Sequence, residues 1–447
     1  MKQFFHFLFL SFLIILPLWA CSQPHPAGFE ITYKPPQNII DKYVYLVGNY
    51  GTKTWVVDSA KFAKKQYLFK NKKEVLPSGF YTILLKNGKI LADFIIDQTR
   101  NFTMDGTTIE SKGKLTFLNS EENIVFQQFK NDLVNDQNLD VYYDTAPESL
   151  LGKFVMAQYI PVRVPEFHWG SHEGSEGAAQ QYYKYLINHY FDNVDFKDER
   201  LMHTPLDINV KEFFLESVFP QTAEVMNDAI DKFLARFLDE NPTQAQKDNQ
   251  DIYLKKLIHT YINAEPKYDE VFIYLVDNYV AKTNTEFISS AERDVFKRIA
   301  DRKRRTLTGE TIPAFESYTI DRHKISTADI KSKYTILWFW DPDCEHCSEY
   351  TPILCDFYSK YHELYQFDVI ACSVTEDYDR WVKFINEHHL EWYNTSYAMG
   401  DPNYDAIEYF NFADTPAVFV IDQQHKIVAR QFHIDDLFEV FESLSQE

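Results

Sequence analysis

Two cysteines that directly follow an apolar run constrain this chain more than any other feature. Residues 334–340 are almost all aromatic or β-branched, which is typical of a buried strand, and a helical pattern extends from Cys347 to about residue 361. In such a strand–turn–helix, Cys344 lies where free backbone N–H groups point outward, and the helix dipole favours its thiolate. The spacing therefore predicts a redox pair in which Cys344 attacks a disulfide and Cys347 resolves the mixed disulfide.

Half of a zinc site is the competing interpretation of this spacing. A structural zinc ion requires four N or S ligands, commonly from a second C-x-x-C or a His pair. Of the five cysteines in the chain, Cys355 and Cys372 also lie in this region, but they are isolated and no matching His pair is near. We expect both to be small buried core residues, with a Cys355–Cys372 disulfide as an open alternative. We therefore predict no metal site and no cofactor.

The segment 310–447 alternates between strand and helix patterns. After the redox motif, the predicted elements are a strand at 367–374, a helix at 379–388, strands at 417–421 and 427–430, and a helix at 435–444. Strands that alternate with helices along the chain are typical of an α/β fold. The pattern predicts one α/β domain over residues 310–447.

Four local motifs of this segment occur in the order found in the thioredoxin superfamily. They are Ile312-Pro313-Ala314-Phe315, Cys344-Glu345-His346-Cys347, Pro352 in the following helix, and Thr415-Pro416 directly before an apolar strand that ends at Asp422. The segment resembles the periplasmic TlpA/ResA-like reductases of that superfamily. The resemblance implies a thioredoxin fold, protein disulfides as substrates and an active site that includes Thr415 and Pro416. It also implies a cis Thr415–Pro416 bond that leaves backbone groups open to a substrate chain.

The segment departs from the family pattern at two positions near the cysteines. Asp343 stands directly before the first cysteine, where the family usually has Trp, and Tyr350 stands three residues after the second, where it often has an acidic residue. Glu349 is one position away, and a helix rotates adjacent residues by about 100°. The buried proton-transfer carboxylate of the relatives is therefore not carried over to a residue of this chain.

His346 lies between the two cysteines and completes our predicted active site. A cationic His beside a thiolate lowers the thiol pKa, which favours the reduced pair and makes the disulfide more oxidising. Asp341, Asp343 and Glu345 act in the opposite direction, because negative charge disfavours a thiolate. An exposed His346 without a role is the other interpretation. The direction of electron flow stays open: the resemblance favours a reductase, whereas His346 favours an oxidant or isomerase.

Residues 25–116 have the pattern of an antiparallel β-sandwich. Aromatic and β-branched runs occupy residues 43–47, 55–57, 80–85 and 90–96. The last two runs flank Asn87-Gly88, and Asn-Gly between two strands is typical of a type I′ hairpin turn.

Residues 117–309 predict a helical domain. Apolar residues recur at helical spacing over residues 223–240, and Asn241-Pro242 is the predicted stop. Further helices are predicted at 181–191, 210–218, 251–262 and 269–280. The basic, polar stretch 301–309 predicts a domain boundary. The order of a β-rich, a helical and a thioredoxin-like domain resembles exported thioredoxin-like proteins of Bacteroidetes.

His168 and His172, with Glu166 and Glu173, form a second group of ligand-type residues. They lie in a segment, 161–177, that is rich in Pro, Gly and Ser, and they lack the i,i+4 register of helical metal motifs. We interpret this group as part of a loop, with a metal role as the minority alternative.

The N-terminus has the pattern of an export signal. A basic start is followed by an apolar run over residues 4–20, which is slightly short for a membrane-spanning helix. Cys21 follows directly, in a setting that resembles a lipobox, although Trp19 replaces the usual small residue. We predict a signal peptide over residues 1–20, lipidation at Cys21, and a place in the periplasm or cell envelope. A plain cleaved signal and an uncleaved anchor are the alternatives.

The charge of the chain excludes some partners. The formal net charge is −21, and the segment from Pro313 onward contains 25 acidic and 9 basic residues. Such a surface repels phosphate backbones, so we expect no nucleic-acid partner and contact with a membrane only through a lipid anchor at Cys21. The expected partners are protein disulfides and a membrane or periplasmic thiol that donates electrons.

Three other functions were weighed against a thiol–disulfide oxidoreductase. A thiol peroxidase usually has Thr three residues before the reactive cysteine, where this chain has Asp341. Copper-handling relatives of the fold use a C-x-x-x-C spacing that is one residue longer. A third alternative makes the first two domains a binding module that recruits a partner, with the redox domain as an appendage.

Overall fold

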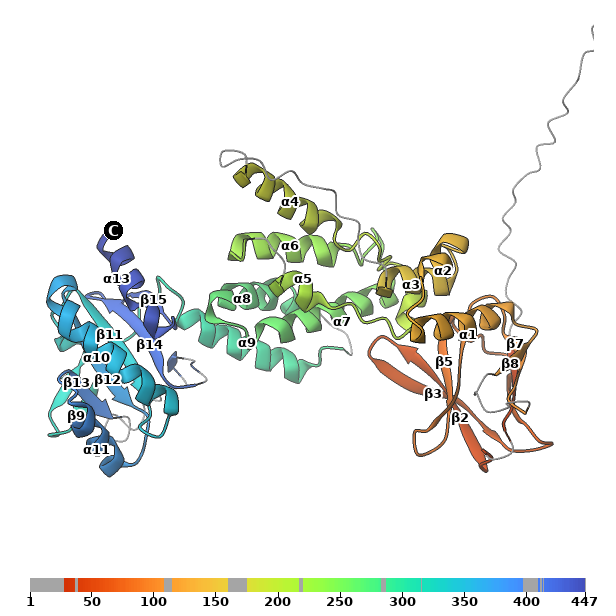
Figure 1. The fold of residues 1–447 in the computed structure, drawn as a ribbon, viewed down its shortest axis with the longest axis horizontal. Coiled ribbons are helices and arrows are strands. Elements are labelled where there is room, and N and C mark those ends of the chain that lie inside the picture. Colours follow the sequence, from red (N-terminus) through yellow and green to blue (C-terminus); the bar gives the residue numbers. More distant parts are fainter. Residues whose placement is uncertain are drawn as a thin grey trace, which may run out of the picture. The chain divides into compact units, whose positions relative to one another are not determined.

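The computed structural model describes residues 28–36, 39–107, 115–159, 175–216, 220–282, 287–314, 316–396, 409–410, 412 and 414–446. Internal contacts divide the chain into two units, Met1–Asn138 and Leu139–Glu447 (Figure 1). The predicted signal peptide, Cys21 and the group around His168 and His172 lie outside the described residues. Within those residues, no helix is long and apolar enough to cross a membrane.

The first unit contains two four-stranded sheets, with the orders β4-β1-β7-β8 and β3-β2-β5-β6. The strands are β1 (Phe29–Lys34), β2 (Tyr43–Tyr50), β3 (Lys53–Lys61), β4 (Tyr67–Asn71), β5 (Gly79–Leu84), β6 (Ile90–Ile96), β7 (Asn101–Asp105) and β8 (Thr116–Leu118). Strand neighbours are antiparallel except β1 and β7, which are parallel. One apolar cluster, with Ile31 and Phe102 from one sheet and Leu46 and Phe94 from the other, forms the core of a β-sandwich.

The hairpin between β5 and β6 contains a different turn from the predicted type I′. A type I′ turn needs positive φ at both central residues, but Gly88 has φ +83° and Asn87 is not among the residues with positive φ. The N–H of Gly88 donates to Leu85 O, and the N–H of Leu85 donates to Lys89 O. The loop is therefore one residue longer, with only the glycine in the left-handed region.

Helix α1 (Glu121–Val134) belongs with the strands of the first unit, although the sequence assigned it to the helical domain. Asn123 donates to Ile95 O and accepts from Ile95 N, both at 2.8 Å, in the manner of a neighbouring strand. The carboxylate of Glu122 accepts the N–H groups of Asp97, Gln98 and Thr99. These polar contacts satisfy the end of β6, and an apolar pattern does not reveal them.

The helical part of the second unit has shifted boundaries relative to the prediction. Its α-helices are α2 (Asp140–Thr145), α3 (Leu150–Tyr159), α4 (Ser175–His189), α5 (Val210–Glu216), α6 (Ala223–Ala235), α7 (Gln244–Tyr261), α8 (Asp269–Asn278) and α9 (Ser290–Arg305). Helix α6 ends five residues before residue 240, the predicted last residue of this helix, and α7 begins seven residues earlier than predicted. The basic stretch in which we predicted a domain boundary includes the last turn of α9, where cations suit the helix dipole.

The remaining part of the second unit is a seven-stranded sheet with the order β10-β9-β13-β12-β11-β14-β15. Its elements are β9 (Glu316–Thr319), β10 (Lys324–Ser326), β11 (Tyr334–Trp340), α10 (Glu345–Tyr365), β12 (Phe367–Ser373), α11 (Tyr378–His388), β13 (Tyr393–Ser396), β14 (Ala417–Asp422), β15 (Ile427–Arg430) and α13 (Leu437–Gln446). Strand β11 pairs in parallel with β12 and antiparallel with β14. The α/β prediction is confirmed, and the structure adds the short strands β9, β10 and β13.

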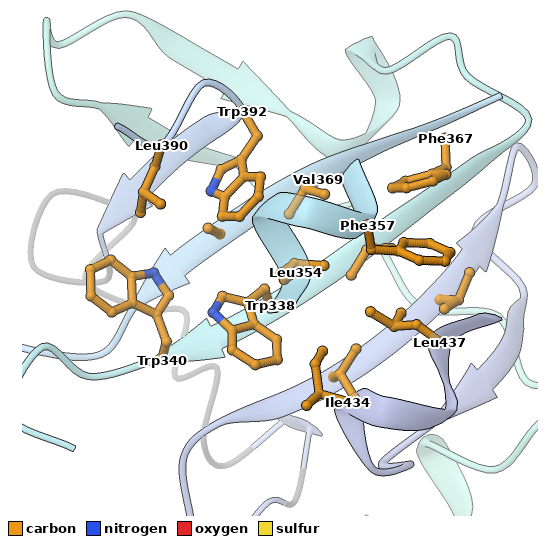
Figure 2. Packing of buried hydrophobic residues seen from close by; sticks show 14 of the residues in the cluster. Trp338, Trp340, Leu354, Phe357, Phe367, Val369, Leu390, Trp392, Ile434 and Leu437 are labelled. Carbon is orange, nitrogen blue, oxygen red and sulfur yellow. The ribbon is translucent and has the colours of Figure 1, made fainter. Parts of the chain in front are cut away.

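This sheet separates two apolar clusters. Trp338 and Trp340 face one of them together with Leu354 of α10, as Figure 2 shows, whereas Leu337 and Phe339 face the other. Strand side chains alternate between the two faces.

The same alternation explains why Cys355 and Cys372 do not pair. Cys355 of α10 packs against the first cluster, whereas Cys372 of β12 belongs to the second, on the opposite face of the sheet. Both carry free thiols, and burial raises the pKa of each to about 11. Cys372 is a buried core residue, as the sequence predicts, whereas Cys355 is only partly buried against its cluster.

A buried ion group connects α8, α9 and β15. The carboxylate of Asp269 binds Lys303 of α9 through one oxygen and Arg430 of β15 through the other, the latter at 2.6 Å. The side chains of Asp269, Lys303 and Arg430 are 3%, 8% and 8% exposed. Because water cannot compensate these charges, each depends on its partners.

Replacing Asp269 with Asn should therefore destabilise the second unit by about 3–5 kcal/mol, because two buried cations lose their counterion. Urea unfolding followed by circular dichroism measures the loss. Asp228→Asn is the matched control: it removes an exposed ion pair with Lys232 in α6 and should cost less than about 1 kcal/mol. Equal unfolding midpoints for the two variants would contradict this account.

Candidate active site

A tight turn joins β11 to α10 and carries the first cysteine. The N–H of Cys344 donates to Asp341 O at 3.1 Å, which closes a β-turn with Pro342 at its second position, where proline is favoured. The carboxylate of Asp341 accepts the N–H of Asp343 at 2.8 Å. An aspartate at the first position of a turn commonly makes this contact with the residue two positions on. The local sequence Asp-Pro-Asp thus fixes the approach to the helix.

The two cysteines occupy unequal places at the start of α10. Cys344 is the N-cap residue, with extended φ and ψ of −84° and 121°, and it is partly exposed. Cys347 is fully buried in the first turn, and its sulfur accepts the N–H of Asp341 at 3.5 Å. Of these two sulfurs, only that of Cys344 is accessible to another molecule.

Thr415 and Pro416 lie directly against this pair. The Cys344 thiol donates to Thr415 O at 3.1 Å across 71 residues of sequence, and the Thr415–Pro416 bond is cis. The antiparallel register of β11 and β14 explains the approach, because Phe339 is opposite Ala417. The structure therefore brings together four of the five predicted active-site residues in one place.

The surroundings shift the pKa values of the two thiols in opposite directions. Burial works against the Cys344 thiolate, but hydrogen bonds of its sulfur with the side chains of Thr415 and Cys347 and with the backbone N–H groups of Cys347 and His346 outweigh burial, so the pKa of Cys344 is lowered. Burial, together with the neighbouring Cys344, raises the pKa of Cys347 to about 12. At neutral pH the outer sulfur is the better nucleophile.

His346, the fifth predicted residue, turns its side chain to solvent. Its Nδ1 lies 3.8 Å from Glu349 Oε2, and its ring stacks on Tyr350 with centroids 5.8 Å apart. The Tyr350 hydroxyl lies 3.1 Å from Nε2 of His433. The position where relatives often have an acid thus holds a Tyr–His pair.

Sequence reasoning missed two residues near the cysteines. His433 is 83 residues from Tyr350, and Arg380, which binds Asp343, is 37 residues from its partner. No local motif links either pair. An unpaired acidic run around Cys344 was the one available signal for a basic partner such as Arg380.

Within the described ranges, no group of three or more His, Cys, Asp or Glu side chains is placed to hold a metal ion.

Residues 332–427 match the model of a family described as thioredoxin-like. The C-terminal domain is a thioredoxin-like domain. The match covers less than a quarter of the chain and includes the strand, both cysteines and the Thr415–Pro416 segment. Among curated proteins, none matches the chain.

Several solved structures resemble parts of this chain. The thioredoxin domain of a thiol-disulfide oxidoreductase from Bacteroides vulgatus is 27% identical, covers 31% of this chain and 97% of its own, and has a TM-score of 0.29. A domain of a possible thiol-disulfide isomerase from Cytophaga hutchinsonii is 26% identical over 32% of this chain and 97% of its own, with a TM-score of 0.29. A thioredoxin-like protein from Bacteroides caccae is 18% identical over 63% of this chain and 99% of its own, with a TM-score of 0.44.

The opposite pKa shifts predict selective alkylation of the reduced thioredoxin-like domain. At pH 7, iodoacetamide should modify Cys344 and leave Cys347 intact, because only Cys344 is both accessible and partly thiolate. Peptide mapping by mass spectrometry measures the extent at each site. The same protein in denaturant should be modified at all four cysteines of the domain. Equal rates at Cys344 and Cys347 in the folded protein would contradict the assignment.

Proposed function

We propose that this protein is an exported thiol–disulfide oxidoreductase and that Cys344 and Cys347 are its redox pair. The single observation that supports this most strongly is the inequality of the two thiols: one accessible and acidified at the helix start, the other buried one turn on. Thiol–disulfide exchange needs an attacking sulfur and a resolving sulfur held close to it.

The proposed cycle uses both sulfurs in turn. The Cys344 thiolate attacks one sulfur of a partner disulfide, whose S–S bond breaks as the mixed disulfide forms and the leaving sulfur takes up a proton. Cys347 then loses its proton and attacks the Cys344 sulfur, which releases the reduced partner and leaves a Cys344–Cys347 disulfide. A thiol electron donor outside the domain reduces that disulfide and completes the cycle.

In this proposal, Thr415 and Pro416 form the part of the active site against which a substrate chain binds. Thr415 O already accepts from the Cys344 thiol, so the backbone at this point lies within hydrogen-bond distance of the reacting sulfur. A substrate chain bound in extended form would meet this edge first. We assign His346 a peripheral role, because its imidazole is exposed beside Glu349.

We propose reduction of periplasmic or envelope disulfides as the direction of the reaction. The reduction potential of the Cys344–Cys347 couple decides between directions: a value near about −270 mV is typical of a reductant, and one near about −120 mV of an oxidant. Equilibration with glutathione or dithiothreitol buffers measures it. An oxidising value would overturn the reductase assignment and leave the redox pair itself intact.

Trapping experiments test the roles of the two sulfurs. Cys347→Ser should leave an attacking thiolate without a resolver, so mixed disulfides with partner proteins should accumulate on a non-reducing gel. Cys344→Ser should abolish exchange and trap nothing, because the remaining sulfur is buried. Cys355→Ser is the control and should behave as the wild type, because Cys355 lies within α10 and its thiol pKa is raised by burial.

Adducts on Cys344→Ser but not on Cys347→Ser would reverse the proposed roles. The oxidoreductase proposal itself fails if the wild type lacks exchange activity and neither variant forms adducts.

Lipidation of Cys21 would attach this activity to a membrane. We expect the wild type to partition into detergent and Cys21→Ser to remain unprocessed in a bacterial host, because lipidation precedes cleavage at a lipobox. Fractionation and mass spectrometry of the mature N-terminus provide the measurement. Wild-type protein found wholly in the aqueous fraction would contradict the lipoprotein proposal.

A further inference from the structure

An exposed arginine of α11 binds the residue directly before the reactive cysteine. We propose that Arg380 is a positioning residue of the redox reaction, which compensates the negative charge around Cys344 and so maintains the reactivity of that sulfur toward disulfides. This inference rests on the proposed function of the Cys344–Cys347 pair.

Four carboxylates lie close to Cys344 in sequence or across the active site. They are Asp341 and Asp343 in the turn, Glu345 at the start of α10, and Asp414 beside Thr415. Like charge disfavours a thiolate, so this set alone would suppress the nucleophile. His346 of α10 is exposed, and its Nδ1 lies 3.8 Å from Glu349 Oε2, so this side chain pairs with Glu349 at the surface.

Arg380 supplies a cation from a different element. Its Nη1 lies 2.5 Å from each carboxylate oxygen of Asp343, and its Nε lies 3.3 Å from Asp377. Electrostatic interactions with Asp377 and Asp341 add to the hydrogen bonds with Asp343 in raising the guanidinium pKa. One guanidinium therefore faces three carboxylates, two of which belong to the turn that carries Cys344.

The fold fixes the backbone of Arg380. Asp377 caps α11 by accepting the Arg380 N–H at 3.1 Å, and the next residue, Trp381, is fully buried in the core. Arg380 thus occupies the first turn of the helix, where a cation opposes the helix dipole. Because a cation in this position does not stabilise α11, the ion pair between Arg380 and Asp343 favours a role other than helix stability.

The chemistry of arginine suits this position. A guanidinium stays charged at every pH at which the thiol titrates, and its several N–H donors reach more than one carboxylate at once. Lysine offers a single ammonium, which can compensate the charge but not hold both Asp343 and Asp377 in the same geometry.

The expected effect is modest, because the ion pair is exposed and salt screens it. At low ionic strength, Arg380→Gln should slow alkylation of Cys344 at pH 7 by roughly two- to fivefold. The midpoint of the pH profile should move to higher pH, because the uncompensated Asp343 carboxylate raises the cost of the thiolate. Asp343→Asn should move the midpoint to lower pH.

The experiment compares these variants in the reduced, full-length protein. Iodoacetamide labelling of Cys344 is followed by mass spectrometry from pH 5 to 10, at low and at high salt. Arg380→Lys should restore part of the wild-type rate, and Arg380→Gln in the Asp343→Asn background should have a smaller effect than in the wild type. Lys383→Gln is the matched control, because it removes a cation paired with Glu387 on the same helix and should leave the profile unchanged.

An unchanged profile in Arg380→Gln would overturn the inference. The inference also fails if Arg380→Gln shifts the midpoint of the pH profile equally in the wild type, in the Asp343→Asn background and at high salt. Such a result would indicate a change of structure rather than of charge. Disulfide exchange with a protein substrate is measured in parallel. A shifted pH profile of Arg380→Gln in a protein without exchange activity would overturn the proposed function but not the role of Arg380. Exchange activity together with an unchanged pH profile of Arg380→Gln would overturn the role of Arg380 but not the proposed function.

Discussion

The antiparallel pairing of β11 with β14 is the constraint on which the active site depends. Strand β11 is buried along its whole length and ends directly before the turn that leads to Cys344, and β14 begins directly after Pro416. Their register places Phe339 opposite Ala417. Two segments that are 71 residues apart in sequence meet at this point, and a one-residue shift of this register would move buried side chains to the other face of the sheet.

The strands at the centre of the sheet were predictable because they are buried on both faces. A central strand in such a fold is a continuous apolar run; the predicted bounds of β11 agree with the structure, and those of its neighbours β12 and β14 agree to within one residue. The three short strands were missed for the opposite reason. In β13, the buried Asn394 and Thr395 are polar, and their side chains donate to Leu390 O and Ala371 O, so no apolar pattern marks the strand.

Helix ends illustrate the same limit. Phe237 is fully buried two residues after α6 ends, so the apolar pattern continues past the last helical hydrogen bond and does not mark the end. Helix α7 begins at a capping box formed by Thr243 and Gln246, but its first turns bury polar residues such as Asn249, which donates to Phe196 O. A polar side chain can be buried where it has a specific hydrogen-bond partner, so a buried position is not always marked by an apolar residue.

The candidate site also has parts that local sequence predicts and parts that it does not. The two cysteines, the helix start and the proline segment follow from local sequence and from the resemblance, because each is a short motif. The partners that set the charge around Cys344 do not, since Arg380 comes from another helix.

The electrostatic balance at Cys344 combines fixed and adjustable contributions. Backbone N–H groups at the start of α10 and the neighbouring Cys347 are part of the fold and cannot be changed without changing the helix. The carboxylates of the turn and Arg380 are exposed side chains that can be replaced with little effect on packing. The thiol pKa lies below its ordinary value even with these acidic neighbours, so the contributions at the start of α10 set its direction, and in our proposal the exposed charges adjust its size. An oxidoreductase built in this way can change its reactivity through surface substitutions while the sheet that positions its sulfurs stays the same.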